Sequence, residues 1–369
     1  MSAFVRFITV HKKLTNKIDY IIVGLGLAGA CLALQLLKRG KRILVYDTPS
    51  QNRASSVAAG LFNPITGKRI VKTWKADEMF SYLFKFYQEA ESDLEIKFFY
   101  KSPLYTPFRA IEEQNEWMSK SADDSFENYI SQVTTEPTFG DEVNDPIGGI
   151  LLSQCGFINT GIFLNGVREL LLQKESYLEE LWLEEKMKTS DNGVAYDNVS
   201  AEKIIYCTGI HALQSKYFEM LPLKMLKGEV MTIKTTKILN RIYNRGVYVV
   251  ESGEMEYKVG ATYDLVNLKP GVTPEGRMEL EQKVRDLLSI PFEVTHQDWG
   301  IRPSTVDRRP IIGQHPIEKN VLIFSGLGTK GVSLAPYFSG QLADYILGRG
   351  NLDKEANITR VKSLYSKFH

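Results

Sequence analysis

The chain has little net charge and few cysteines. Its 45 Lys and Arg residues nearly balance its 44 Asp and Glu residues, so the net charge is +1 at pH 7. Proteins that hold nucleic acid or a membrane surface by electrostatics usually carry a marked excess of positive charge. The sequence therefore gives no electrostatic reason to expect either partner.

The three cysteines form no CxxC pair and no metal-ligand spacing, and no other metal-binding constellation is present. Cys31 and Cys207 lie in apolar segments, where a buried and inert thiol is expected. This cysteine usage predicts a reducing, cytoplasmic setting.

Repeats and low-complexity tracts are also absent. The 369 residues are 43% hydrophobic and 24% charged, which is the composition of a globular protein of about two domains. Residues 1–17 contain basic residues but no acid, yet they lack the apolar run of a secretory signal. We interpret them as an N-terminal extension.

A glycine-rich turn between two apolar segments is the most informative feature that is present. Residues 18–47 are typical of a strand, a turn, a helix, a second strand and then an acid. Gly24 permits a tight turn, Gly26 leaves room for a pyrophosphate, and Gly29 lets the helix pack close to the strand. The order of these parts predicts a dinucleotide-binding unit.

The helix and the acid complete that unit. The helix Leu27–Lys38 would direct its N-terminal amides at the phosphates. Asp47 falls where a carboxylate accepts hydrogen bonds from an adenosine ribose. Residues 18–37 are apolar enough to suggest a membrane span instead, and a lone glycine fingerprint is weak. Asp19, the glycines and the second strand argue against the span.

Two further glycine-bearing turns follow apolar strands. The first lies in Glu202–Ala212, where a buried strand ends in small residues. The second follows a strand over Val321–Phe324, with a turn at Ser325–Gly331 and a helix over Val332–Leu347. One such turn suits a nicotinamide cofactor, whereas three scattered turns favour a longer one, namely FAD.

The segments between these turns have a different pattern. Asp77–Glu95 is an amphipathic helix by its periodicity, and alternating runs predict an antiparallel sheet with one open face. These runs are Glu229–Ile233, Val247–Val250, Tyr257–Tyr263 and Glu293–Gly300.

We therefore predict an α/β fold in which a Rossmann-like FAD-binding domain is joined to an α+β substrate domain built on an antiparallel sheet. The predicted FAD-binding domain is discontinuous and comprises residues 18–60, 151–215 and 300–350. The predicted substrate domain comprises residues 61–150 and 216–299, and the pocket should lie between the two domains.

Taken together, these motifs resemble the glycine oxidase and D-amino-acid oxidase family of FAD enzymes. A similar pattern occurs in the oxidase domain of the bifunctional enzyme that modifies the wobble uridine of tRNA. The matching segments span the chain from Asp19 to Gly350. They are Gly-Leu-Gly-Leu-Ala-Gly at 24–29, Ser-Ser-Val-Ala-Ala-Gly at 55–60, Cys-Thr-Gly at 207–209, Lys-Gly-Glu-Val at 227–230, Val-Gly-Ala-Thr-Tyr at 259–263, Gly-Ile-Arg-Pro-Ser-Thr-Val-Asp at 300–307 and Gly-Leu-Gly-Thr-Lys-Gly-Val at 326–332.

The resemblance implies a set of cofactor contacts, with the backbone near Met187 meeting the adenine and Gly328–Val332 facing the flavin pyrimidine. The amides that open the last helix would offset the negative charge of a reduced flavin, and the Lys330 side chain either adds to this or is solvated. The implied FAD contacts are Gly24, Gly26, Leu27, Ala28, Gly29, Asp47, Ser55, Ser56, Ala59, Gly60, Met187, Cys207, Thr208, Gly209, Arg302, Gly328, Thr329, Lys330, Gly331 and Val332.

Two positions depart from what relatives often have. Some relatives attach the flavin through a cysteine in the segment that matches 300–307, and this chain has none there, so we expect non-covalent FAD. The family often has Glu at the ribose position, where this chain has Asp47. The shorter side chain still offers two acceptor oxygens.

Arg302 is the principal substrate candidate. Pro303 restricts the Arg302 backbone to extended conformations, and by resemblance this arginine grips the substrate carboxylate with two donors. The alternative is a structural ion pair with Asp307. Tyr248 matches a pocket tyrosine that helps to hold the carboxylate, although half-buried packing is the alternative.

Several other side chains are candidates for the pocket. Asn63 could reach the substrate face of the flavin, although an Asn before a proline is also ordinary turn chemistry. His211 follows the second turn and is expected beside the cofactor, whereas His296 and His315 have no evident catalytic partner. The remaining candidates for the lining, with core packing as the alternative, are Trp74, Tyr263 and Trp299.

The resemblance implies an FAD-dependent oxidoreductase that oxidises the C–N bond of a small carboxylate-bearing amine, of the glycine, sarcosine or D-amino-acid type. A hydride passes to the flavin, and an acceptor such as oxygen takes up the electrons. Three alternatives stay open: oxidation of a glycine-like group on modified tRNA, flavin binding without amine turnover, and an NAD-dependent dehydrogenase. The sequence does not predict the oligomeric state.

Overall fold

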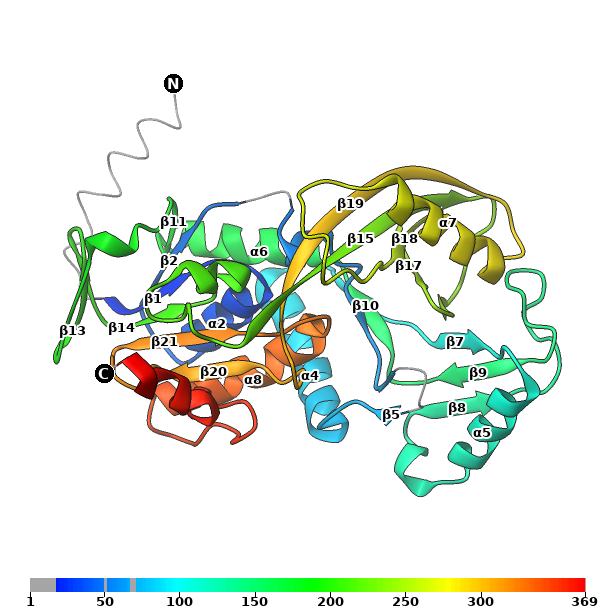
Figure 1. The fold of residues 1–369 in the computed structure, drawn as a ribbon, viewed down its shortest axis with the longest axis horizontal. Coiled ribbons are helices and arrows are strands. Elements are labelled where there is room, and N and C mark those ends of the chain that lie inside the picture. Colours follow the sequence, from blue (N-terminus) through cyan, green and yellow to red (C-terminus); the bar gives the residue numbers. More distant parts are fainter. Residues whose placement is uncertain (1–17, 50–51, 67–70, 369) are drawn as a thin grey trace.

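The computed structural model describes residues 18–49, 52–66 and 71–368 (Figure 1). The predicted N-terminal extension, residues 1–17, lies outside this part of the chain. Two large sheets organise the molecule, and the chain crosses between them several times. The predicted α/β fold with parallel and antiparallel sheets is confirmed.

The first sheet is parallel at its centre. β1 (Ile18–Val23) lies between β2 (Ile43–Asp47) and β14 (Val199–Tyr206), and β21 (Val321–Ser325) follows β14. The outer strands of this sheet are β11 (Tyr177–Glu179), β12 (Met187–Ser190), β13 (Gly193–Tyr196) and β20 (Ile311–Gln314). Its central strands are almost fully buried, because α-helices cover one face and the segments that carry Trp182, Phe218 and Ile358 cover the other.

Helices α2 (Leu27–Lys38) and α8 (Gly331–Ile346) begin directly after the carboxyl ends of β1 and β21. They pack against each other, and α6 (Thr160–Gln173) packs beside α2. The first helix has the predicted bounds, and the last begins one residue earlier than predicted. Parallel strands direct both helix N-termini to the same edge of the sheet.

The second sheet is antiparallel except where β7 runs parallel to β16. Its strands, in spatial order, are β19 (Phe292–Thr305), β15 (Leu223–Thr235), β18 (Glu256–Gly260), β17 (Tyr248–Gly253), β16 (Ile242–Asn244), β7 (Leu104–Pro107), β9 (Gly149–Leu152) and β8 (Ile130–Val133). Helix α7 (Pro274–Leu287) packs on β15 and β18 through buried leucine and valine side chains.

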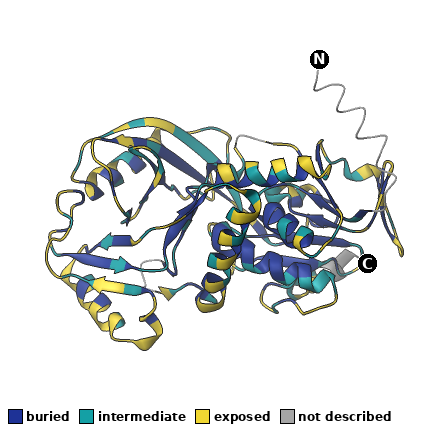
Figure 2. Ribbon diagram, turned by 180° about the vertical axis from the view of Figure 1, so that it is seen from behind, coloured by how far each residue is buried: buried dark blue, intermediate teal, exposed yellow. Residues whose placement is uncertain are grey.

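Short elements connect the sheets. The longest helix is α4 (Ala76–Leu94), predicted over 77–95, and its buried face packs against α8. Burial alternates around α4 as the amphipathic pattern requires (Figure 2). The others are α3 (Ala54–Val57), β3 (Leu61–Phe62), β4 (Ile65–Thr66), β5 (Val71–Lys72), β6 (Phe99–Lys101), α5 (Ile111–Ser121), β10 (Gly156–Ile158) and the 3₁₀ segments Asp124–Phe126, Glu184–Lys186, Gly209–Gln214 and Ile358–Phe368.

The second sheet differs from the prediction at several strand ends. β15 and β19 are longer than predicted, and the strand predicted over 257–263 ends at Gly260. β9 belongs to this sheet although residue 151 was assigned to the FAD-binding domain, and β19 crosses residue 300. The division into two domains at the predicted limits therefore remains a proposal.

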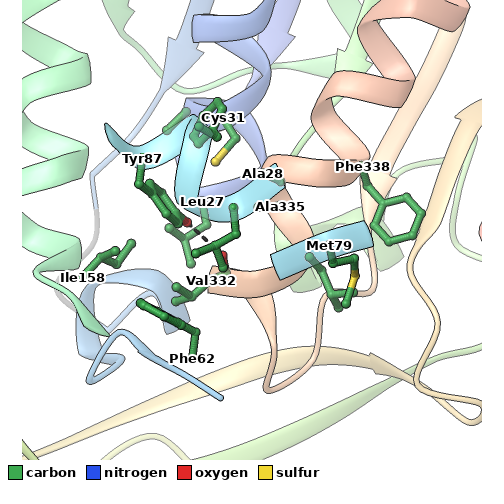
Figure 3. Packing of buried hydrophobic residues seen from close by; sticks show 14 of the residues in the cluster. Leu27, Ala28, Cys31, Phe62, Met79, Tyr87, Ile158, Val332, Ala335 and Phe338 are labelled. Carbon is green, nitrogen blue, oxygen red and sulfur yellow. Dashed lines mark hydrogen bonds between the residues drawn. The ribbon is translucent and has the colours of Figure 1, made fainter. Parts of the chain in front are cut away.

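Buried side chains of α2, α4 and α8 form a shared core next to the glycine-rich turn between β1 and α2 (Figure 3). Tyr87 of α4 lies between Cys31 of α2 and Val332 of α8, and its hydroxyl donates to the Val332 carbonyl oxygen at 2.9 Å. Cys31, Cys155 and Cys207 are buried free thiols, as predicted for the first and last of them. Burial raises the pKa of each thiol, which keeps it protonated and unreactive.

Candidate active site

A cavity of about 1660 Å³ lies where the carboxyl ends of the first sheet meet β17, β19 and the segment that follows β18. All three glycine-bearing turns contribute to its lining. The predicted residues that line it are Gly24, Gly26, Leu27, Ala28, Asp47, Ser55, Ala59, Gly60, Cys207, Thr208, Gly209, Tyr248, Arg302, Gly328, Thr329, Lys330, Gly331 and Val332. Gly29, Ser56 and Met187 are not part of the lining.

The first turn has the close approaches that the sequence predicts. Gly24 has φ of 97°, and a Cβ there would lie 2.7 Å from the Cys207 carbonyl oxygen. A Cβ on Gly29 would overlap the carbonyl oxygen of Gly24, so Gly29 serves the packing of α2 on β1 without lining the cavity. Gly26 precedes α2 and provides no side-chain cap, which leaves the helix N-terminus open to an anion.

Asp47 is buried at the end of β2 and already has two protein partners. Its Oδ1 accepts from the Leu25 amide at 2.9 Å, and both of its oxygens accept from Arg53 Nη2 at 3.1 Å. A carboxylate has about four acceptor positions, so room remains for a ribose hydroxyl. Sequence reasoning missed Arg53, which also donates to the carbonyl oxygens of Leu25 and Thr48 and so ties the two strand ends together.

The end of the cavity next to Asp47, which we call the nucleotide end because the ribose is predicted there, is aromatic. Trp182 lines it and stacks on Tyr196 with ring centroids 3.9 Å apart, and Tyr206 closes the same end. Met187, predicted at the adenine through its backbone, has its side chain in the hydrophobic core beyond this end. Trp182 had no sequence signal, since it lies in an irregular segment before β12.

The opposite end of the cavity receives the N-terminus of α8. Lys330 occupies the N-cap position and makes no capping bond to the helix amides, while its Nζ donates to Thr73 Oγ1 at 2.8 Å. Burial and then the neighbouring charges of Arg308 and Arg309 lower the pKa of Lys330 to about 8. The structure therefore favours the cavity-facing interpretation of this lysine over the solvated one.

Arg302 lies on β19 with its guanidinium group against Gly228 of β15. A Cβ on Gly228 would come within 2.6 Å of the Arg302 Cζ, so the missing side chain creates the space for this group. The alternative pairing with Asp307 is wrong, because Asp307 pairs with Arg360 at 2.5 Å. Within the described residues, Arg302 has no carboxylate partner.

Burial lowers the pKa of Arg302, while the hydroxyls of Tyr248 and Tyr263 oppose that shift. An arginine remains charged even so. A charged group in this position is therefore available to an anion that enters the cavity.

Tyr248 lies on β17, and its side chain is close to that of Arg302 on β19. It is opposite Gly260 of β18, and a Cβ on that glycine would lie 2.5 Å from the Tyr248 hydroxyl oxygen. Burial raises the pKa of Tyr248, and the nearby charge of Arg302 acts against this. Gly228 and Gly260, on the neighbouring strands β15 and β18, thus leave room for the side chains of Arg302 and Tyr248. Both side chains point into the same part of the cavity, which we call the chamber.

The remaining candidates divide into two groups. Asn63, Trp74, His211, Tyr263 and Trp299 all line the cavity. Asn63 also donates to the Ile65 carbonyl at 2.8 Å, which is the turn chemistry expected of it, and His211 Nδ1 lies 3.1 Å from Gln214 Oε1.

The other two histidines lie elsewhere. His296 pairs with Asp298 on an exposed strand, and buried His315 lies edge-on to Tyr217 and Phe218.

A buried ion pair behind the chamber escaped sequence reasoning. Lys227 Nζ lies 3.5 Å from Glu229 Oε1, and both side chains are at most 5% exposed. The Glu229 carboxylate also accepts from the Thr273 amide and hydroxyl, both at 2.9 Å, and from Gln297. The matching Lys-Gly-Glu-Val segment was the available signal, but it did not reveal these partners.

The lining suits a long dinucleotide with anionic groups. Two helices open on the cavity without caps from their own N-cap side chains and without acids in their first turns, as phosphates and a reduced flavin would require. The Leu27 amide of α2 donates to Ser55 Oγ at 3.1 Å. Glycines stand where a ligand must approach the backbone closely. Within the described residues, no helix is long and apolar enough to cross a membrane, and residues 18–37 form a strand, a turn and part of a helix.

Comparison with known proteins shows which family the chain resembles. The chain is 25% identical over 358 residues to the tRNA 5-methylaminomethyl-2-thiouridine biosynthesis bifunctional protein of Idiomarina loihiensis, covering 92% of this chain and 57% of that protein. It thus spans little more than half of that relative. It is 26% identical to the glycine oxidase of Bacillus licheniformis, covering 90% and 94%.

Among solved structures, glycine oxidase from Geobacillus kaustophilus superimposes with a TM-score of 0.75 at 20% identity, covering 91% of this chain and 96% of the other. This likeness establishes the shared fold. Residues 19–345, which include every strand of the first sheet but the start of β1, match the family described as FAD dependent oxidoreductase, and the chain belongs to that family.

Proposed function

We propose that this enzyme oxidises the C–N bond of a small amine that carries a carboxylate. The observation that carries the proposal is the Arg302 guanidinium, which lines the cavity, rests on Gly228 and has no carboxylate partner within the described residues. Arginine binds a carboxylate through two parallel hydrogen bonds, which fixes orientation as well as position. Tyr248 supplies a hydroxyl on the same side of the chamber.

FAD, when bound, supplies the hydride acceptor. The residues proposed to hold it are the open N-termini of α2 and α8, the turn that includes Ser55, Ala59 and Gly60, and the Asp47–Arg53 pair. We propose that it is bound without a covalent link, since residues 300–307 contain no cysteine and the lining Cys207 is a buried, protonated thiol.

The chain's own task in the reaction is to orient the substrate. The amine must arrive neutral, because an ammonium nitrogen has no lone pair to support departure of a hydride from the α-carbon. Arg302 and Tyr248 would hold the carboxylate so that the α C–H bond faces the acceptor. Loss of the hydride and of the N–H proton gives an imine, which water hydrolyses to an oxo acid and ammonia or a primary amine.

Two accompanying assignments complete the proposal. Oxygen or another acceptor takes the two electrons, and neither choice is fixed by the described residues. The cytoplasm is the proposed location, on the basis of the three free thiols.

Anaerobic bleaching of the flavin absorbance tests this function. The purified protein is mixed with glycine, sarcosine, proline and D-amino acids, and at least one carboxylate-bearing amine should bleach it. Arg302→Gln should lower kcat/KM about 10- to 100-fold, because loss of a charged hydrogen-bond partner costs about 1.5–3 kcal/mol. Bound FAD should remain.

The control is Arg349→Gln, which changes an exposed arginine outside the cavity. Unchanged turnover by Arg302→Gln would exclude its role. A flavin that no amine bleaches would favour a flavin-binding protein without turnover.

A second candidate is a glycine-like group carried on modified tRNA. The tRNA candidate is favoured by cationic side chains at the end of the cavity next to the α8 N-terminus, which we call the redox end. They are Lys72, Arg308, Arg309 and Lys330. Bleaching by substrate-bearing tRNA but by none of the small amines would select it.

A further inference from the structure

Charged side chains are distributed unevenly along the cavity. Among the residues that the structure describes, three carboxylates line the cavity, Asp47, Glu180 and Glu184, and they lie at the nucleotide end, around Trp182 and β2. Apart from Arg53, which pairs with Asp47, the lining cations belong to the redox end. They are Lys72, Arg302, Arg308, Arg309 and Lys330.

Some of these cations have carboxylate partners outside the lining. Lys72 Nζ lies 2.8 Å from Asp77, and Arg309 Nε lies 3.5 Å from Glu355. Arg302 and Arg308 have none among the residues that the structure describes. One substrate carboxylate would satisfy Arg302, and the α8 N-terminus would face the flavin. A simple amino acid, which has one carboxylate, would therefore leave Arg308 without an anionic partner.

Contacts between three chain segments bring Arg308, Arg309 and Lys330 together at one wall of the redox end. Arg309 stacks on Trp74 with its Cζ 4.1 Å from the ring centroid, and Lys330 donates to Thr73, the residue before Trp74. Arg308 lies close enough to Lys330 to depress the lysine pKa, as does Arg309. A cluster of like charges is costly unless an anion offsets it.

The turn that presents Arg308 is fixed by its own hydrogen bonds. The Arg308 amide donates to the Thr305 carbonyl at 3.2 Å, and the Thr305 hydroxyl donates to the Arg309 carbonyl at 2.6 Å. Asp307 is held by Arg360, so it does not neutralise Arg308. The backbone that carries the Arg308 side chain is therefore already in place before an anion binds, so only the side chain has to become ordered.

We propose that Arg308, Arg309 and Lys330 form a second anion subsite, and that the preferred substrate is a small amine bearing two anionic groups. One carboxylate binds Arg302 and the second anionic group binds the wall at Arg308. This inference rests on the proposed function, because it names the substrate class of the same chamber. No additional chemical step is required, since the second group is only bound.

Paired probes that differ by one carboxylate test the subsite. Oxydiacetate and methoxyacetate have an ether oxygen in place of the amine, so they bind without reacting. Their affinities for the FAD-loaded protein are measured from the change in flavin absorbance. Oxydiacetate should bind about tenfold more tightly, about 1.4 kcal/mol. High salt should reduce this preference, because Arg308 is exposed and its attraction is screened.

Arg308→Gln should remove most of that preference, whereas Arg349→Gln should retain it. A parallel measurement compares kcat/KM for iminodiacetate and for N-ethylglycine, and Arg308→Gln should lower the ratio of the two about tenfold. Equal affinity of wild-type protein for both ethers, or an unchanged preference in Arg308→Gln, would overturn the subsite.

The binding measurement separates this inference from the proposed function. If no amine bleaches the flavin but oxydiacetate is still preferred through Arg308, the function fails and the anion subsite stands. If amines are oxidised without any preference for two carboxylates, the function stands and the subsite fails. If tRNA competes through Arg308 while oxydiacetate is not preferred, the anion is an RNA phosphate and the small dianion is excluded.

Discussion

Tyr87 replaces a backbone donor that Val332 lacks. The Val332 carbonyl in the first turn of α8 would normally accept from the amide four residues on, but that residue is Pro336, which has no N–H. The Tyr87 hydroxyl donates to this oxygen instead, at 2.9 Å, from helix α4 (Figure 3). The helix end that lines the cavity is therefore held in place by a residue 245 positions earlier.

Removal of this hydroxyl should destabilise the protein. Tyr87→Phe leaves a buried carbonyl unsatisfied, which costs about 1–3 kcal/mol in the free energy of unfolding. FAD should also bind more weakly, because the first turn of α8 is less well fixed. Urea denaturation and FAD titration measure the two effects.

Pro336→Ala provides the matched test, because it restores an amide at position 336. In the double variant Tyr87→Phe/Pro336→Ala, the helix can satisfy Val332 itself, so the two changes should be non-additive. Additive losses would show that the hydrogen bond does not act through the Val332 carbonyl.

Gly228→Ala should impair the substrate site selectively. The new Cβ would come within 2.6 Å of the Arg302 Cζ, and the flexible guanidinium can move away at small cost in stability. Displacement by about 1 Å is enough to lose much of the orientation that catalysis needs. We expect kcat/KM to fall by one to two orders of magnitude with the melting temperature nearly unchanged.

Gly253→Ala is the control for this change. Its new Cβ would meet only the Glu256 side chain, at ordinary contact distances of 3.4 and 3.6 Å, so it tests the loss of a strand glycine away from Arg302. If both variants lose activity equally, the space over Gly228 has no specific role.

The glycine turns were predictable because their signals are local. The spacing of Gly24, Gly26 and Gly29 fixes a turn and a helix start within a few residues, and the strand on either side confirms the context. Arg302 was likewise identified from a short segment, through its resemblance to a family motif.

The partners of these residues were not predictable, because they come from distant strands. Arg53 reaches Asp47 through a turn with no sequence signal, and Glu229 gains its role from Thr273 and Gln297 on other elements. The backbone contact near Met187 came from resemblance alone; Met187 does not line the cavity and its side chain lies in the core, so that contact stays a prediction.

Glu229 should stabilise the segment that carries Tyr263. Its backbone bonds to Thr262, and its carboxylate holds Thr273 at the start of α7, so both ends of the intervening loop depend on one residue. Glu229→Ala would also leave Lys227 buried without its partner, a change that costs about 3–5 kcal/mol. Chemical denaturation measures the loss.

The double variant Lys227→Met/Glu229→Gln separates the two contributions. It removes both charges but keeps an amide that can accept from Thr273, so it should recover most of the lost stability. If it is as unstable as Glu229→Ala, the buried charge on Lys227 is not the cause.

Lys330 should make the stability of the FAD-free protein depend on pH. Its pKa is lowered from 10.5 to about 8, so the folded protein releases this proton at a lower pH than the unfolded chain. The charged lysine therefore costs stability below pH 8, and the cost fades as the pH rises from 8 to 10.5. Lys330→Met should stabilise the FAD-free protein at pH 7, by about 1–3 kcal/mol.

Lys330→Met should also weaken FAD binding, because it removes a positive charge that would attract the negatively charged groups of FAD at the start of α8. Stability curves at pH 7 and pH 10, with exposed Lys319→Met as the control, measure the difference between variant and wild type. That difference should be positive at pH 7 and much smaller at pH 10. A difference that is the same at both pH values would mean that Lys330 carries no strained charge, and that its contact with Thr73 alone decides its contribution.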